Sequence, residues 1–107
     1  MSVEEKAKEL AQAIKESPEY QELTSAQTRI TLDPRAQEIV KQIQEERQNL
    51  MQAQMSGQQI TQGMTQKLVA LQKQAENNTT LNKLFKAQEE FNKVMESVNK
   101  TLTEELY

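Results

Sequence analysis

The chain has 107 residues, of which 27% are charged and 36% are hydrophobic, and it contains no cysteine, histidine or tryptophan. These absences exclude disulfides, cysteine-ligated zinc or iron–sulfur clusters, and catalytic sites that pair a nucleophile with histidine. The 13 basic and 16 acidic residues give a net charge of -3, which argues against nucleic acid as the main ligand. The length fits a single domain, and the low apolar content predicts thin apolar seams instead of a bulky core.

The opening residues, MSVEEKAKELAQ, are charged and lack the apolar core of a signal peptide. No segment approaches the roughly 20 consecutive apolar residues that a membrane-spanning helix needs. The absence of cysteine also agrees with a reducing compartment. We therefore expect a cytoplasmic protein with no membrane contact.

Apolar stripes with helical spacing recur along the chain and strand-like alternation is missing, which predicts an all-α fold. Short N-terminal helices are expected over about residues 3–31. The first stripe consists of Ala7, Leu10, Ala11 and Ile14. Ser17-Pro18 then predicts a second helix, because Ser caps free amides and Pro suits the first helical position. The stripe of that helix consists of Tyr20, Leu23, Gln27 and Ile30.

A longer helix is predicted from Asp33-Pro34, which repeats the pattern of a cap followed by proline, to about Met55. Its apolar stripe consists of Ala36, Ile39, Val40, Ile43, Leu50 and Met51. Glu46 and Arg47 interrupt this stripe, either as a solvated stretch or as a buried ion-pair position. We favour the solvated stretch, since long charged side chains are rarely fully buried.

The stretch QMSGQQIT, residues 54–61, separates two amphipathic runs and contains Gly57. Glycine after a helix readily takes the left-handed conformation that ends the helix. We therefore predict a helical hairpin over about residues 34–106, with its turn near residues 56–60 and with Thr61 capping the return helix. A kink in one long rod is the weaker alternative.

The return arm carries two apolar stripes. The first consists of Met64, Leu68, Leu71 and Ala75. Residues 77–80, NNTT, then offer either a break capped by Thr79 or Thr80, or a kink. Beyond them, apolar residues alternate spacings of three and four, which is typical of coiled-coil packing. This predicted self-association seam consists of Leu81, Leu84, Phe91, Met95, Val98 and Leu102.

The predicted helices are long for a compact monomer. At 1.5 Å per residue the two longest would measure about 40 Å and about 33 Å, whereas a compact 100-residue domain has a radius of gyration of about 13 Å. Part of the seam would then lie in water, at a cost of roughly 1.5–3 kcal/mol per large side chain. We therefore predict an elongated all-α hairpin or bundle that assembles as a homodimer or a higher oligomer. The pattern leaves open whether the N-terminal helices pack within one copy or against a neighbour.

No group of residues predicts catalysis, and we expect no enzyme activity, no cofactor and no metal site. Adjacent acidic pairs such as Glu89-Glu90 point about 100° apart on a helix and do not converge. Helical di-metal sites use a Glu-x-x-His spacing, which a chain without histidine cannot supply.

A candidate partner surface lies between Glu46 and Glu76, where acidic residues are missing and Arg47, Lys67 and Lys73 remain. It either contacts a partner protein or RNA, or is a polar face that is merely solvated, and we favour the solvated face. RNA is the weaker partner, because the basic residues are dispersed and no aromatic residue lies among them. The methionines of the chain form either an adaptable binding surface or, as we favour, core filler.

The ordered set of segments SPEYQEL, LDPRAQEIV, QMSGQQIT, LVALQKQAENN and LTEELY resembles the bacterial helical proteins of the YlbF/YmcA/YheA type, most closely the YheA-like branch. The similarity covers nearly the whole chain. It implies an all-α protein that forms dimers or higher oligomers in the bacterial cytoplasm. It also implies a regulatory or adaptor role through protein–protein contacts, with a link to RNA processing as the alternative.

The resemblance brings no catalytic residue to this chain. Some relatives hold iron–sulfur clusters through cysteines, and this sequence has none, so no cluster is expected. The hairpin is also similar to that of the small secreted Trp-x-Gly proteins, but Met55-Ser56-Gly57 contains no tryptophan.

Overall fold

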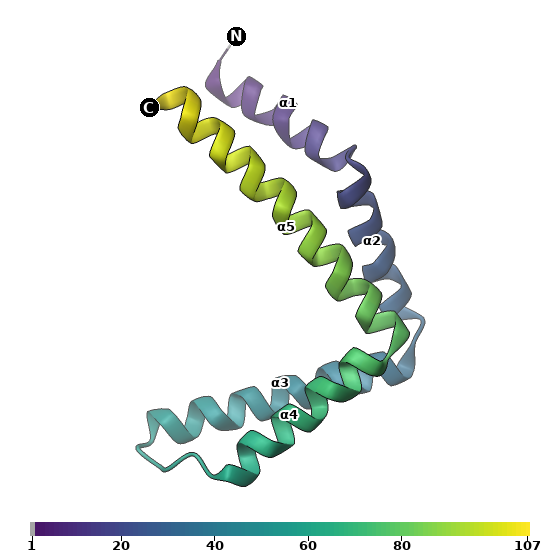
Figure 1. The fold of residues 1–107 in the computed structure, drawn as a ribbon, viewed down its shortest axis with the longest axis vertical. Coiled ribbons are helices and arrows are strands. Elements are labelled where there is room, and N and C mark those ends of the chain that lie inside the picture. Colours follow the sequence, from purple (N-terminus) through teal and green to yellow (C-terminus); the bar gives the residue numbers. More distant parts are fainter. Residues whose placement is uncertain (1) are drawn as a thin grey trace. The chain divides into compact units, whose positions relative to one another are not determined.

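The structure is a computed structural model that describes residues 2–107. These residues form five α-helices and no strand (Figure 1), so the all-α prediction is confirmed. The helices are α1 (Val3–Lys15), α2 (Pro18–Thr31), α3 (Pro34–Met55), α4 (Gln62–Asn77) and α5 (Thr79–Leu106). None of the helices in residues 2–107 combines the length and the apolar character needed to cross a bilayer.

The two helices of the hairpin begin at the predicted capping residues. At the start of α3, Asp33 Oδ1 accepts a hydrogen bond from the Ala36 N–H at 3.1 Å. At the start of α4, Thr61 Oγ1 accepts one from the Met64 N–H at 3.2 Å. Each cap satisfies an amide that has no partner within its helix, which is why the sequence could locate both starts.

The break between α4 and α5 is also real, but its capping residue is Asn78. Asn78 Oδ1 accepts a hydrogen bond from the Leu81 N–H at 3.0 Å. The prediction that Thr79 or Thr80 is the cap was wrong, since α5 begins at Thr79 and both threonines lie in its first turn. Asparagine caps a helix at least as well as threonine, and here it comes one residue earlier in the chain.

The turn between α3 and α4 depends on Gly57, whose φ is +74°. The Gln58 N–H donates to the Ala53 carbonyl at 2.9 Å, and the Gly57 N–H donates to the Gln54 carbonyl at 3.3 Å. This pair of bonds is the Schellman motif, in which the residue after the helix is left-handed. The helical hairpin is therefore confirmed for α3 and α4, which pack against each other. The predicted extent of the hairpin, to about residue 106, stays a prediction.

Gly57→Ala is expected to lower the free energy of unfolding by about 1 kcal/mol, because a left-handed conformation is strained for residues with a Cβ. Nothing lies within 4 Å of the added methyl group, so the cost comes from the backbone alone. Gly63→Ala is the matched control, since its methyl group would meet only Thr61 Oγ1 at 3.8 Å. Urea unfolding followed by circular dichroism measures both variants. Equal losses of stability would contradict the prediction.

The contacts within the chain group into two compact units, which we describe separately. The terminal unit consists of the residues up to Thr28 together with Lys83–Tyr107, and the hairpin unit is Arg29–Asn82. The single-domain organisation stays a prediction.

In the terminal unit, α2 covers part of α5. The buried residues of this contact are Leu23, Ala26 and Ala87. Leu84 and Phe91 pack against them, and the Phe91 ring meets the Tyr20 ring edge to face with the centroids 5.7 Å apart. At least in this contact, an N-terminal helix packs within the same chain.

In the hairpin unit, the core follows the predicted apolar stripes except at Ala53, which is buried although no predicted stripe included it. Its buried hydrophobic residues are Ala36, Ile39, Ile43, Ala53, Leu71, Ala75 and Leu81. The alanines on both helices allow α3 and α4 to approach closely. The interpretation of the methionines as core filler was wrong for Met51 and Met55, which are 59% and 82% exposed. Met64 is half-buried.

Candidate interaction surfaces

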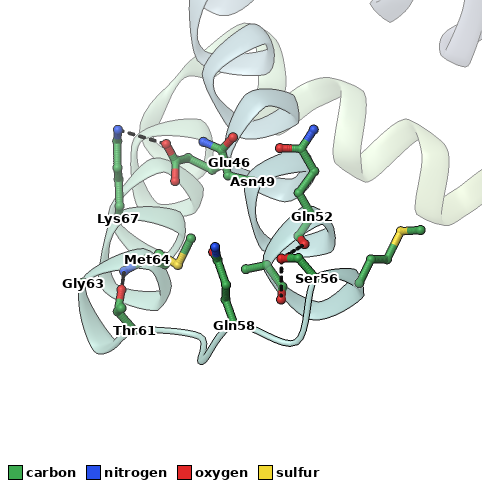
Figure 2. A pocket seen from close by; sticks show the side chains of 11 residues that line it. Glu46, Asn49, Gln52, Ser56, Gln58, Thr61, Gly63, Met64 and Lys67 are labelled. Carbon is green, nitrogen blue, oxygen red and sulfur yellow. Dashed lines mark hydrogen bonds and ion pairs between the residues drawn. The ribbon is translucent and has the colours of Figure 1, made fainter.

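The hairpin unit holds a buried carboxylate on α3. Glu46 is 8% exposed, and its Oε1 lies 2.9 Å from the Lys67 Nζ of α4 (Figure 2). The prediction that this position is solvated was therefore wrong for Glu46, although Arg47 is exposed as expected. The physical reason is that the counter-charge comes from the other arm of the hairpin, which makes burial of the carboxylate tolerable.

The pair also raises the pKa of the lysine. The hydrogen bond to Glu46 is the main reason that the pKa of Lys67 is raised above its usual value, and attraction to the charges of Glu46 and Glu45 adds to it. A lysine is protonated at neutral pH in any case, and the raised pKa of Lys67 extends that charge state to higher pH. The Glu46–Lys67 ion pair joins α3 to α4.

A groove of about 930 Å³ opens between α3 and α4 near their turn, and Glu46 and Lys67 lie on its wall (Figure 2). The other labelled side chains around it are mostly amides and hydroxyls, together with the thioether of Met64. No residue from Gln48 to Gln66 is charged. Apart from Glu46 and Lys67, the residues that line the groove are uncharged.

The three basic residues of the predicted partner surface differ in their surroundings. Lys67 is engaged by Glu46. Lys73 lies on α4 along a face that includes the apolar Val69 and Ala70. The other two, Arg47 and Lys73, have no ion-pair partner among the described residues. The predicted surface is therefore weaker as a site for a polyanion than its composition indicates.

The N-terminal half of the predicted seam is used within the chain. Leu81 is fully buried in the hairpin unit. Leu84 and Phe91 pack against the α2 core of the terminal unit. These three residues consequently offer little apolar surface to a second copy.

The C-terminal half of α5 keeps an apolar face that the chain covers only in part. Met95 and Val98 are half-buried, and Leu102 is 47% exposed. Val98 and Leu102 line an open groove of about 200 Å³ together with Leu10 of α1, which is itself 37% exposed. Helix α1 contains no buried residue at all. We call this surface the α1–α5 face, defined by Leu10, Val98 and Leu102.

Asp33 connects the start of α3 with the start of α5. A hydrogen bond with the Thr80 side chain is the main reason that the pKa of Asp33 is lowered, and the bond from the Ala36 N–H contributes next. A carboxyl whose pKa is lower in the folded than in the unfolded chain stabilises the fold above the unfolded-state pKa. That contribution is lost as the pH falls through the folded-state pKa.

Asp33→Asn is expected to cost stability at neutral pH and to cost progressively less below about pH 4, because asparagine can still cap the helix but carries no charge. Thermal unfolding of the wild type and the variant between neutral and strongly acidic pH measures this difference. Glu38→Gln is the control, since Glu38 is an exposed carboxylate of the same helix that accepts a hydrogen bond from Gln42. A stability difference between wild type and Asp33→Asn that is constant over the whole pH range would contradict the prediction.

Within residues 2–107, acidic side chains do not gather into a group that could hold a metal ion. The features that stand out are a partly covered apolar helix face and a mostly uncharged groove containing one ion pair. In the described residues, these two features are the candidate contact surfaces of a small helical protein.

The chain belongs to the family described as "Control of competence regulator ComK, YlbF/YmcA", whose model matches residues 3–107. The predicted resemblance to this family is therefore confirmed, and the closer relation to the YheA-like branch stays a prediction. By its description, the family is linked to control of the competence regulator ComK.

Three relatives show how far the similarity extends. A UPF0342 protein of Desulfitobacterium hafniense is 33% identical over 100 residues, which cover 94% of this chain and 76% of the relative. One from Halalkalibacterium halodurans is 31% identical over 105 residues, covering 98% and 90%. One from Bacillus licheniformis is 31% identical over 113 residues, covering 100% and 94%.

Proposed function

We propose that this chain is a non-enzymatic regulatory or adaptor protein that self-associates and acts through protein–protein contacts in the bacterial cytoplasm. The observation that carries the proposal is the α1–α5 face, where Leu10 and Leu102 remain 37% and 47% exposed. Covering large apolar side chains gains roughly 1.5–3 kcal/mol for each one that is fully buried. The family's link to control of the competence regulator ComK supports the regulatory role.

A second copy of the chain can cover this face with its own. A twofold contact uses the same residues on both copies, so Leu102 of each copy can lie against the Leu10 and Val98 region of the other. The contact uses the C-terminal part of the predicted seam, because Leu84 and Phe91 already pack on α2.

Sedimentation velocity of the wild type and of Leu102→Asp tests self-association. We expect the wild type to be a dimer or larger and Leu102→Asp to have a lower mass with unchanged helix content. Leu32→Asp is the control, since Leu32 is 78% exposed and lies in the hairpin unit. A Leu102→Asp variant with the wild-type mass would remove the α1–α5 face from the proposal.

The adaptor role is tested by purifying a tagged copy at its native level from its own bacterium, with and without ribonuclease, and by identifying the recovered proteins by mass spectrometry. A protein partner in fixed ratio that survives ribonuclease is the expected result. Recovery that depends on RNA would instead favour an RNA-associated factor, which has less structural support because Lys67 is engaged by Glu46. Recovery of the tagged chain alone would contradict the adaptor role.

A further inference from the structure

We propose that Met51 and Met55 of α3 form a site of reversible oxidation, at which a hydroperoxide converts both thioethers to sulfoxides while the hairpin unit keeps its fold. The chain contains no cysteine, so its methionines are the only sulfur groups that an oxidant can reach. Methionine sulfoxide is returned to methionine by dedicated reductases, which makes the modification reversible. The site lies in the hairpin unit and does not depend on the α1–α5 face.

The four methionines of residues 2–107 differ in how far they are exposed. Met51 and Met55 are 59% and 82% exposed, whereas Met64 and Met95 are half-buried. An oxidant has to reach the sulfur atom, so the susceptibility of a thioether follows its exposure. The first two sulfurs to react in the folded chain are therefore those of Met51 and Met55.

The two thioethers share one side of α3. Residues four apart on a helix are neighbours on its surface, so Met51 and Met55 lie on the same face. Ala53 is 3% exposed and lies two residues from each of them, which corresponds to a rotation of about 200° around the helix. Both methionines are consequently on the side of α3 opposite to the buried Ala53. An oxygen atom added there meets solvent and does not enter the packed contact with α4.

The surroundings can also satisfy the new polar group. A sulfoxide oxygen accepts hydrogen bonds, and at an exposed position water supplies them without a desolvation cost. Arg47 is exposed, lies four residues before Met51, and has no ion-pair partner among the described residues. Its guanidinium can therefore donate to the oxygen on Met51. The oxidised chain thus gains no buried polar atom that lacks a partner.

The chemical step needs no catalytic group from the protein. A lone pair of the thioether sulfur attacks the outer oxygen of the hydroperoxide, the S–O bond forms and the O–O bond breaks. The sulfur loses two electrons and the peroxide gains them. The leaving oxygen takes up the proton and departs as an alcohol, or as water when the oxidant is hydrogen peroxide. The product is a polar side chain where an apolar one stood, so the outer face of α3 changes from apolar to polar.

Treatment of the full-length chain with hydrogen peroxide tests the site, with mass spectrometry of peptides measuring oxygen uptake at each methionine. In the folded chain we expect Met51 and Met55 to react at least about fivefold faster than Met64 and Met95. In concentrated urea the four rates should lie within about twofold of one another, because the fold then protects none of them. The circular dichroism spectrum of the doubly oxidised chain should match that of the untreated chain. Methionine sulfoxide reductases should remove both oxygens.

Three results would each overturn the proposal. The first is oxidation of Met64 or Met95 in the folded chain as fast as that of Met51 and Met55, which is also the result if another molecule covers the outer face of α3. The second is a loss of helix content when only Met51 and Met55 are oxidised. The third is a pair of sulfoxides that the reductases leave in place.

Replacement of the two methionines by leucine provides a second test that keeps the face apolar. The chain carrying both Met51→Leu and Met55→Leu should take up at least about fivefold less oxygen during the initial phase of the reaction, with unchanged helix content. Met64→Leu is the matched control, because it removes one half-buried sulfur from the same unit and should leave the initial uptake unchanged. Equal initial uptake by the double variant and by Met64→Leu would show that Met51 and Met55 are not the reactive site.

Discussion

Phe91→Asp is expected to unfold the contact between α2 and α5, and not merely to separate two copies of the chain. The Phe91 ring packs against the Leu23 and Ala26 cluster and meets the Tyr20 ring at 5.7 Å. Removing a packed aromatic ring and placing a carboxylate among apolar groups should lower the free energy of unfolding by at least about 3 kcal/mol. Urea unfolding followed by circular dichroism, repeated at several protein concentrations, measures this loss.

Leu102→Asp is the matched control for this experiment, because it introduces the same residue into the same helix at a position that is 47% exposed. It should change the free energy of unfolding of the monomer by less than about 1 kcal/mol. Its main effect should be on mass. A Phe91→Asp variant whose monomer is as stable as the wild type, but whose assembly has a lower mass, would contradict the expectation. It would place Phe91 in an interface between copies.

The sequence was sufficient to locate the helices because their ends depend on local chemistry. Asp33-Pro34, Thr61 and Gly57 each place a capping group or a permissive backbone within a few residues of the helix end that it determines. The single error of this kind, at Asn78, concerned which of several adjacent capping residues is used. The apolar stripes of α3 and α4 were also predictable, since they follow directly from helical periodicity.

What covers each stripe could not be predicted, because a stripe has the same spacing whichever helix lies against it. The α5 seam was assigned to a second copy, yet Leu84 and Phe91 lie against α2 of the same chain. Glu46 shows the same limit for charge. Its place within an apolar stripe was visible, but Lys67, which makes its burial tolerable, belongs to another helix. A lysine within the acid-free stretch between Glu46 and Glu76 was the one available signal.

Leu81→Ala is expected to cost about 2–5 kcal/mol of the free energy of unfolding, as large-to-small substitutions in a packed core do. Leu81 is fully buried, and its N–H donates to the Asn78 cap, so the residue fixes the start of α5 by both its side chain and its backbone. A side chain with no exposed surface cannot touch a second copy. The loss should therefore be the same at every protein concentration, unlike the loss from a substitution at an interface.

Leu106→Ala provides the comparison, because it removes the same atoms from the same helix at a position that is 73% exposed. It should change the free energy of unfolding by no more than about 0.5 kcal/mol. Urea unfolding of both variants at low and high protein concentration separates the two roles. Equal effects of Leu81→Ala and Leu106→Ala, or a loss at Leu81 that grows with protein concentration, would contradict the buried position. The seam predicted over Leu81 to Leu102 would then be an interface along its whole length.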